Sequence, residues 1–190
     1  MSLFEPYTQL LNNLEQLGTQ LSHQHAAHLN CRAGCSGCCL PGLGVFRVEA
    51  DALHQALRAL PTAVRTRVLH QAEAALAAPH IQEHCALLDQ DLCSLYAYRP
   101  VICRTHGFPI HFETEPGEVA LDVCPLNFTE TGSLEKLTLS ETLALDRLNL
   151  RLSAINYVYC RDQLHNAELA EERISLAQLA VEALREDTRP

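Results

Sequence analysis

The chain has 190 residues, a formal net charge of −9 and nine cysteines. A chain of this length can bury a hydrophobic core without covalent cross-links, and it fits one domain over residues 1–190. Nucleic acid is disfavoured as a partner, because phosphate binding needs clustered basic side chains and Lys136 is the only lysine.

Two further classes of protein are disfavoured by the apolar pattern. No run approaches the roughly 18 consecutive apolar residues of a membrane-spanning helix. Residues 1–8 lack the basic flank and apolar segment of a signal peptide. We therefore expect no membrane partner and a cytoplasmic location, where cysteines stay reduced.

Residues 1–30 are expected to form a helical flank. Pro6 suits a first helical turn, and leucines follow at helical spacing. The pattern predicts an amphipathic helix over 6–29 that leads into Cys31, with its apolar face formed by Leu10, Leu14, Leu17 and Leu21.

The next segment holds four cysteines within nine residues, separated only by small or polar residues, so it is not one face of a helix or strand. Gly34 and Gly37 allow a tight backbone that can direct several sulfurs to one centre, as thiolate-metal knuckles require. This spacing predicts metal ligands at Cys31, Cys35, Cys38 and Cys39.

Two helices are expected after a loop at 41–44 and a short extended piece at 45–48. The first covers about 49–60, and the second runs from Pro61 to about Ala78 and stops before Pro79. Their apolar stripes are Leu53, Leu57 and Leu60 in the first, and Val64, Val68, Ala72 and Ala75 in the second.

A second cysteine group follows. Asp89-Gln90-Asp91 predicts a tight acidic turn that brings Cys85 and Cys93 near each other. Arg99-Pro100 then begins a short turn or helix that holds Cys103. Residues 108–113 and 118–123, joined by Pro116-Gly117, have the pattern of a hairpin that delivers Cys124.

Residues 133–190 are expected to form a second helical flank, with helices over 133–163 and 167–187. Their apolar stripes comprise Leu145, Leu148, Leu152, Ile155 and Tyr159, then Ile174, Ala177, Val181 and Leu184. The expected fold is mainly α: a helical domain around an irregular cysteine-rich metal centre, with one or two short β-hairpins.

The cysteine order over 31–125 resembles that of the bacterial cysteine-cluster family of the YkgJ type, which is described as zinc- or iron-chelating. The resemblance rests on C-x3-C-x2-C-C from Cys31, on Cys93-x2-Tyr96-x2-Arg99-Pro100-x2-Cys103-Arg104, and on Cys124-Pro125. Cys85 is followed by alanine where this family usually has proline, which leaves the ligand in place. The resemblance implies a metal site without specifying a reaction.

The predicted metal ligands are therefore Cys31, Cys35, Cys38, Cys39, Cys85, Cys93, Cys103 and Cys124. Thiolates suit zinc or iron, including a 4Fe-4S cluster, whereas magnesium and calcium prefer oxygen. The side chains of adjacent residues diverge, so Cys38 and Cys39 either serve two centres or include a spare thiol. Arg99 and Arg104, on either side of Cys103, are the candidates to bind the cofactor, by donating to its sulfurs or by fixing the loop. The alternative is that both are solvated or packing arginines.

Other residues are interpreted more simply. Cys160 lies outside the motif, in a helical segment, and is expected to be a core thiol. Tyr96 is expected to be a core aromatic. His28, His84 and His106 lie close in sequence to cysteines and are reserve ligands only.

The leading functional hypothesis is a metal-binding protein without catalysis of its own. The alternative is an iron-sulfur-dependent oxidoreductase or protein-modifying enzyme, because flagellin lysine methylases carry a similar cysteine cluster. The radical-SAM spacing at Cys31, Cys35 and Cys38 lacks the usual aromatic before its third cysteine, where Gly37 stands. Thiol-disulfide exchange lacks its usual βαβ setting. The sequence specifies no protein partner beyond a metal ion.

Overall fold

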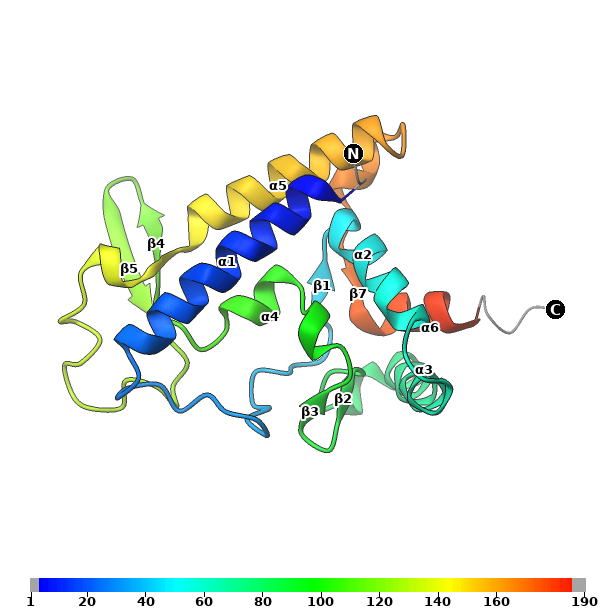
Figure 1. The fold of residues 1–190 in the computed structure, drawn as a ribbon, viewed down its shortest axis with the longest axis horizontal. Coiled ribbons are helices and arrows are strands. Elements are labelled where there is room, and N and C mark those ends of the chain that lie inside the picture. The colour runs from blue at the N-terminus through cyan, green and yellow to red at the C-terminus, as the bar shows by residue number, and fades with distance from the viewer. Residues whose placement is uncertain (1–3, 186–190) are drawn as a thin grey trace. The chain divides into compact units, whose positions relative to one another are not determined.

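The computed structural model describes residues 4–185, which divide into two compact units. The first comprises Phe4, Ala33–Pro100 and 156–185, and the second comprises Glu5–Arg32 and Val101–Ile155. Figure 1 labels the helices and strands of both. Most of the regular structure is helical and the strands are short, as the sequence predicts. The expectation of one domain over 1–190 stays a prediction.

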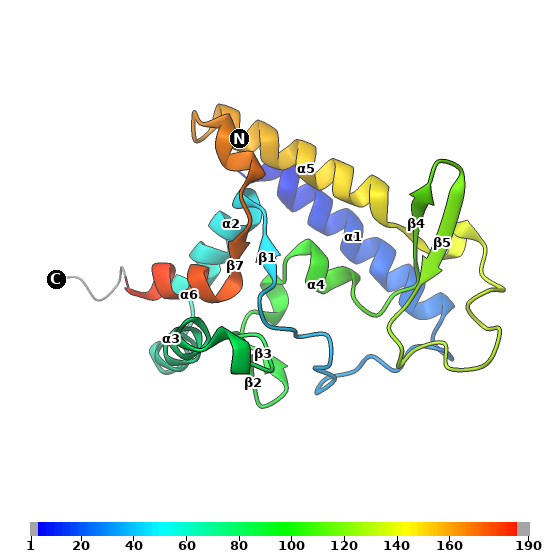
Figure 2. The same cartoon turned by 180° about the vertical axis from the view of Figure 1, so that it is seen from behind.

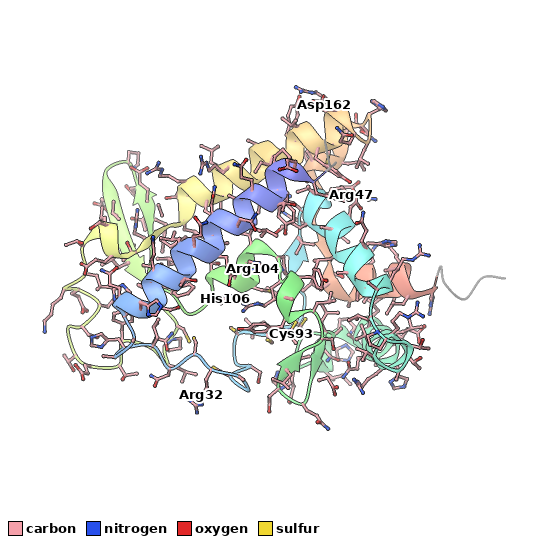
Figure 3. All side chains as sticks on the ribbon, viewed as in Figure 1. Arg32, Arg47, Cys93, Arg104, His106 and Asp162 are labelled. Atoms are coloured by element: carbon pink, nitrogen blue, oxygen red, sulfur yellow. The ribbon has the colours of Figure 1, made fainter. Side chains whose placement is uncertain are left out.

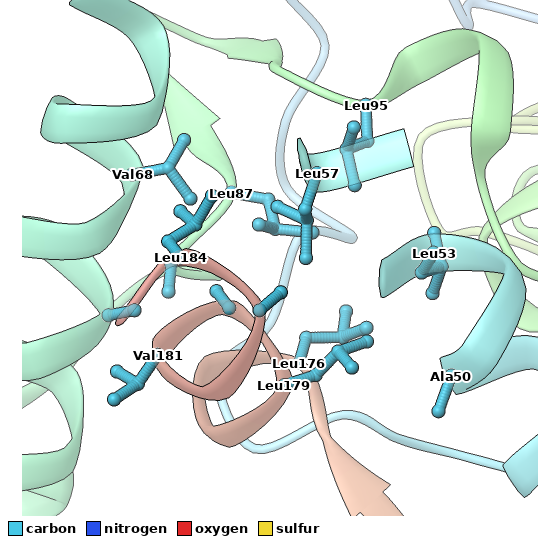
Figure 4. Close-up of a cluster of buried hydrophobic side chains, with 14 of the residues drawn as sticks. Ala50, Leu53, Leu57, Val68, Leu87, Leu95, Leu176, Leu179, Val181 and Leu184 are labelled. Carbon is cyan, nitrogen blue, oxygen red and sulfur yellow. The ribbon is translucent and has the colours of Figure 1, made fainter. Parts of the chain in front are cut away.

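The first unit is built on three helices. They are α2 (Arg47–Arg58), α3 (Thr62–Ala77) and α6 (Leu176–Arg185), and α6 packs against both others. Figure 4 shows the leucines and valines that fill the space between them. The predicted stripes of α2 and α3 are confirmed, since Leu53, Leu57, Val68 and Ala72 are all buried in this core.

Short strands and 3-10 turns complete the first unit. Strand β1 (Gly44–Val45) pairs antiparallel with β7 (Ile174–Ser175), and β2 (Leu88–Asp89) pairs antiparallel with β3 (Leu92–Cys93). The 3-10 turns are η1 (Pro79–Ile81), η2 (Tyr96–Tyr98) and η4 (Ala167–Glu171).

The second unit contains α1 (Glu5–Gln24), whose face of Tyr7, Leu10, Leu14 and Leu21 is buried. Helix α4 (Val101–Thr105) packs against α1. Strands β4 (Ile110–Glu115) and β5 (Glu118–Asp122) form the predicted antiparallel hairpin. Strand β6 (Leu143–Ala144) adds to β4 in parallel, after the 3-10 turn η3 (Leu139–Glu141). Figure 2 shows the same elements from behind.

Three predicted helices have different limits in the structure. The helix expected over 6–29 ends at Gln24, after which the chain tightens into a turn in which the His28 amide donates to the His25 carbonyl at 2.8 Å. The ring of the buried His25 bonds to the carbonyl of Glu141 at 2.8 Å. The helix expected over 133–163 begins only with α5 (Leu145–Asp162), which contributes to both units. Its expected first turns are replaced by η3 and by β6, where the Leu143 amide donates to the Pro109 carbonyl.

The helix expected over 167–187 is wrong in its first half. Ile174 pairs with Val45 in the β1–β7 ladder, so α6 begins at Leu176. Residues 186–187 of that helix, and residues 1–3 of the N-terminal flank, lie outside the described residues.

Candidate metal centre

Five of the eight motif cysteines lie in two segments of the first unit, a loop and the segment of a short hairpin. The loop that carries Cys35, Cys38 and Cys39 has no regular structure beyond turns. Gly34 takes a φ of +85°, a value that favours glycine, and the Cys39 amide donates to the Ser36 carbonyl at 2.8 Å. The loop is therefore a series of tight turns, as its glycines predict.

The second segment is the β2–β3 hairpin, in which Leu88 lies opposite Cys93. Gln90 and Asp91 both have positive φ, as a two-residue hairpin turn requires. Buried Leu87 and Leu95 fix the two ends of the hairpin in the core. The predicted acidic turn between Cys85 and Cys93 is confirmed.

Two hydrogen bonds connect the loop to the hairpin segment. The Cys85 amide donates to the carbonyl of Cys39 at 2.8 Å, and the Ser36 hydroxyl donates to the carboxylate of Asp91. The backbone thus holds Cys39 and Cys85 close together, although they lie far apart in the sequence.

The thiols of this group affect one another electrostatically. Burial raises the pKa of Cys85 to about 11, with further raising contributions from the charges of Cys93 and Cys39. Burial also raises the pKa of Cys39, and the charges of Cys93 and Cys35 raise it further. A hydrogen bond with Cys38 lowers the pKa of Cys39. Burial raises the pKa of Cys93 as well. Five sulfurs therefore belong to one interacting group: Cys35, Cys38, Cys39, Cys85 and Cys93.

Arg99 is the cation of this group. Its charge lowers the pKa of both Cys39 and Cys93, against the effect of burial. The guanidinium lies 3.7 Å from the centre of the Tyr96 ring, and its Nε donates to the Tyr96 carbonyl at 3.1 Å. Tyr96 itself is 63% exposed, so the expectation of a core aromatic is wrong: it supports Arg99 at the surface.

The other three motif cysteines belong to the second unit. Cys103 lies within α4 and is partly buried, and Cys124 follows β5. Cys31 is exposed, but its sulfur lies against the backbone at Gly107. The two are so close that a Cβ added to Gly107 would be 2.5 Å from the sulfur. Gly107 has a φ of +97°.

Asn127 is a site residue that the sequence analysis missed. It is 2% exposed, and its side-chain Nδ2 donates to the Sγ of Cys31 at 3.4 Å and to the carbonyl of Gly107 at 2.7 Å. The backbone N–H of Asn127 donates to the carbonyl of Cys124. Its position three residues after Cys124, in a Cys-Pro turn, is the only signal for it in the sequence.

The remaining candidates are placed as follows. Arg104 forms an ion pair with Glu15 at 2.8 Å, in the region that Figure 3 shows with His106. The ring of His28 stacks on Phe128, and His84 is exposed. Partial desolvation lowers the pKa of His106. The interpretation of His28, His84 and His106 as reserve ligands stays a prediction.

Cys160 is set apart from the motif. It is fully buried in α5, and its thiol donates to the side-chain oxygen of Asn156 at 3.8 Å. The expectation of a core thiol is confirmed. No disulfide joins any of the nine cysteines, all of which lie within residues 4–185. Over the same residues, no three His, Cys, Asp or Glu side chains are arranged to hold a metal ion directly.

Comparison with known proteins concerns the same stretch of chain. The family model CxxCxxCC, "Putative zinc- or iron-chelating domain", matches residues 30–125. The chain belongs to the CxxCxxCC family. The expected resemblance over 31–125 is thereby confirmed. No curated protein and no solved structure matches the chain. Among the described helices, none is long and apolar enough to cross a membrane.

This member of the CxxCxxCC family departs from the spacing in the family name. Three residues, not two, separate Cys31 from Cys35. The last of them is Gly34, whose left-handed backbone conformation lets the chain turn where the additional residue stands.

Proposed function

We propose that this protein binds zinc or iron through cysteine thiolates, and that Cys39, Cys85 and Cys93 are the centre of the ligand set. The supporting observation is that these three thiols are partly buried and that the Cys85 amide donates to the Cys39 carbonyl, while the charge of Cys93 raises the pKa of both Cys39 and Cys85. A cation would neutralise the charge that makes their ionised forms unfavourable together. The donor set fits both metals, because thiolate sulfur is the ligand that zinc and iron-sulfur clusters share.

Cys35 and Cys38 are the candidates to complete this set, since both interact with Cys39. Only one is needed for four thiolates, which allows the other to remain a spare thiol. Arg99 reduces the excess negative charge of four thiolates around a divalent ion, whose formal total would be −2. Cys31, Cys103 and Cys124, which belong to the second unit, are proposed separately as metal ligands, with Arg104 of the same unit as a further donor. The proposal also includes a cytoplasmic location, where these thiols stay reduced.

The experiment is elemental analysis of protein purified without oxygen. We expect at least about one equivalent of zinc plus iron in the wild type. Cys39→Ser should lower the bound metal to less than half of the wild-type amount. Cys160→Ser is the matched control, because this thiol is in the core, and it should keep the metal.

A folded wild-type protein without bound metal, after reconstitution with zinc and with iron plus sulfide, would overturn the proposal. Equal metal loss in both variants would overturn the ligand assignment. The colour distinguishes the metals, since iron-sulfur proteins are brown and zinc proteins are colourless.

A further inference from the structure

The side chain of Asn127 is buried and uses both ends of its amide. Its Oδ1 accepts a hydrogen bond from the Asn30 backbone N–H at 2.7 Å. Its Nδ2 donates to the Gly107 carbonyl at 2.7 Å and to the Cys31 sulfur at 3.4 Å. Exchanging the nitrogen and the oxygen would place two acceptors against each other at Gly107 and two donors at Asn30. The network therefore fixes the orientation in which the N–H groups face Cys31.

The surroundings of the Cys31 sulfur are restricted on one side. Gly107 has no side chain there, and a Cβ would come within 2.5 Å of the sulfur. The backbone at this position has a φ of +97°, which favours glycine. Gly107 and Asn127 thus form one wall against which Cys31 rests, while the residue as a whole is exposed.

We propose that Asn127 is a positioning residue for Cys31: its amide fixes the sulfur and donates a hydrogen bond to the thiolate when metal is bound. The inference rests on the proposed function, in which Cys31 is a ligand. A hydrogen bond to a thiolate is stronger than one to a neutral thiol, because the acceptor is charged. Groups that hydrogen-bond a metal ligand typically change metal affinity by about 10-fold to 100-fold when mutated.

A purely structural role for Asn127 makes a different prediction. Asn127 joins the segment around residue 30 to the turn after Cys124, so its loss could act through loop stability alone. Asn30 provides the matched control. Its side-chain Nδ2 donates to the Leu126 carbonyl at 2.6 Å and joins the same two segments. Asn30→Ala removes that bond and keeps the backbone N–H that Asn127 accepts.

The test uses cobalt(II) as the probe, with Asn127→Asp, Asn127→Ser and Asn30→Ala. Asn127→Asp keeps an oxygen for the Asn30 N–H and removes the donor to sulfur. We expect cobalt(II) affinity to fall about 10-fold to 100-fold in both Asn127 variants and by less than about 3-fold in Asn30→Ala. The thiolate-to-cobalt absorption should move to longer wavelength only in the Asn127 variants, because an unbonded sulfur gives up electron density more easily.

The outcomes separate the two proposals. If the wild-type protein binds cobalt(II) and both Asn127 variants match it in affinity and absorption, the proposed role of Asn127 is overturned and the proposed function is not. Equal weakening in all variants without a spectral shift also overturns the role of Asn127, because this is the result of loop stability. Wild-type protein that binds neither cobalt(II), zinc nor iron overturns both proposals. Urea unfolding checks each variant, and Asn127→Ser decides the matter if Asn127→Asp does not fold.

Discussion

At the scale of single residues, the structure gives glycines and asparagines roles that the cysteine pattern does not indicate. Gly107 allows its backbone to approach the Cys31 sulfur, and Asn127 fixes that sulfur through its amide. Arg99 provides positive charge near Cys39 and Cys93. The thiols in this family member therefore depend on residues of other types, which lie outside the ligand motif or between its cysteines.

Gly107→Ala tests the close approach. The new Cβ would come within 2.5 Å of the Cys31 sulfur, so Cys31 or the loop has to move. In addition, a side chain at positive φ costs about 1 to 2 kcal/mol. We expect Gly107→Ala to lower the free energy of unfolding in urea by more than this amount, and to lower the content of bound metal.

The control for that prediction is Gly117→Ala. Gly117 has a φ of +86°, but no atom lies within 4 Å of the position of its Cβ. Gly117→Ala should lower the free energy of unfolding only by the cost of a side chain at positive φ, about 1 to 2 kcal/mol, and should keep the bound metal. Equal losses of stability in the two variants, with metal retained in both, would show that the approach to Cys31 has no consequence.

At the scale of elements, short strands and one buried asparagine hold the helices of the first unit together. Asn156 of α5 is fully buried. Its Oδ1 accepts the Val48 N–H at the start of α2, at 3.0 Å, and its Nδ2 donates to the Ala170 carbonyl at 3.1 Å. The first turn of a helix has amides without partners in the helix, so Asn156 stabilises the start of α2 from another element.

Asn156→Ala should therefore be strongly destabilising. It leaves a buried amide and a buried carbonyl without partners, and each unsatisfied group costs about 1 to 3 kcal/mol. We expect urea denaturation to show a loss of about 2 kcal/mol or more. Asn149→Ala is the control, because Asn149 is exposed on the same helix, and it should change stability by less than about 0.5 kcal/mol. Similar effects at both positions would contradict this account of α2.

At the scale of the whole molecule, the helical core and the cysteine segments depend on metal to different degrees. The core of the first unit consists of leucine, valine and alanine side chains on α2, α3 and α6. The loop that carries Cys35, Cys38 and Cys39 has no such core of its own. Metal binding can therefore order the cysteine segments without being needed for the helices.

Removal of the metal with a chelator should accordingly lower the melting temperature while most of the helical circular dichroism remains. The reason is that ligand binding stabilises the folded state, whereas the apolar core persists without it. Re-addition of the metal should restore the melting temperature. A complete loss of helical signal on chelation would show that the core depends on the metal, and an unchanged melting temperature would show that the metal stabilises nothing.

Much of this molecule follows from local sequence. The stripes at Leu53 and Leu57 and at Val68 and Ala72 are helical because apolar side chains recur once per turn, and they are buried as expected. The β2–β3 turn follows from its short acidic connection. The cysteine spacing led to the family, because a dense run of thiols is rare for any other reason.

Other features were decided only by tertiary structure. Strands β1, β6 and β7 have two residues each, too few for a periodic pattern, and they exist because a distant partner supplies their hydrogen bonds. The same holds for Asn127 and Asn156, whose partners are 96 or more positions away at Cys31 and Val48. Which sulfurs interact is likewise a property of the fold, because a cysteine's spacing in sequence does not fix the direction of its side chain.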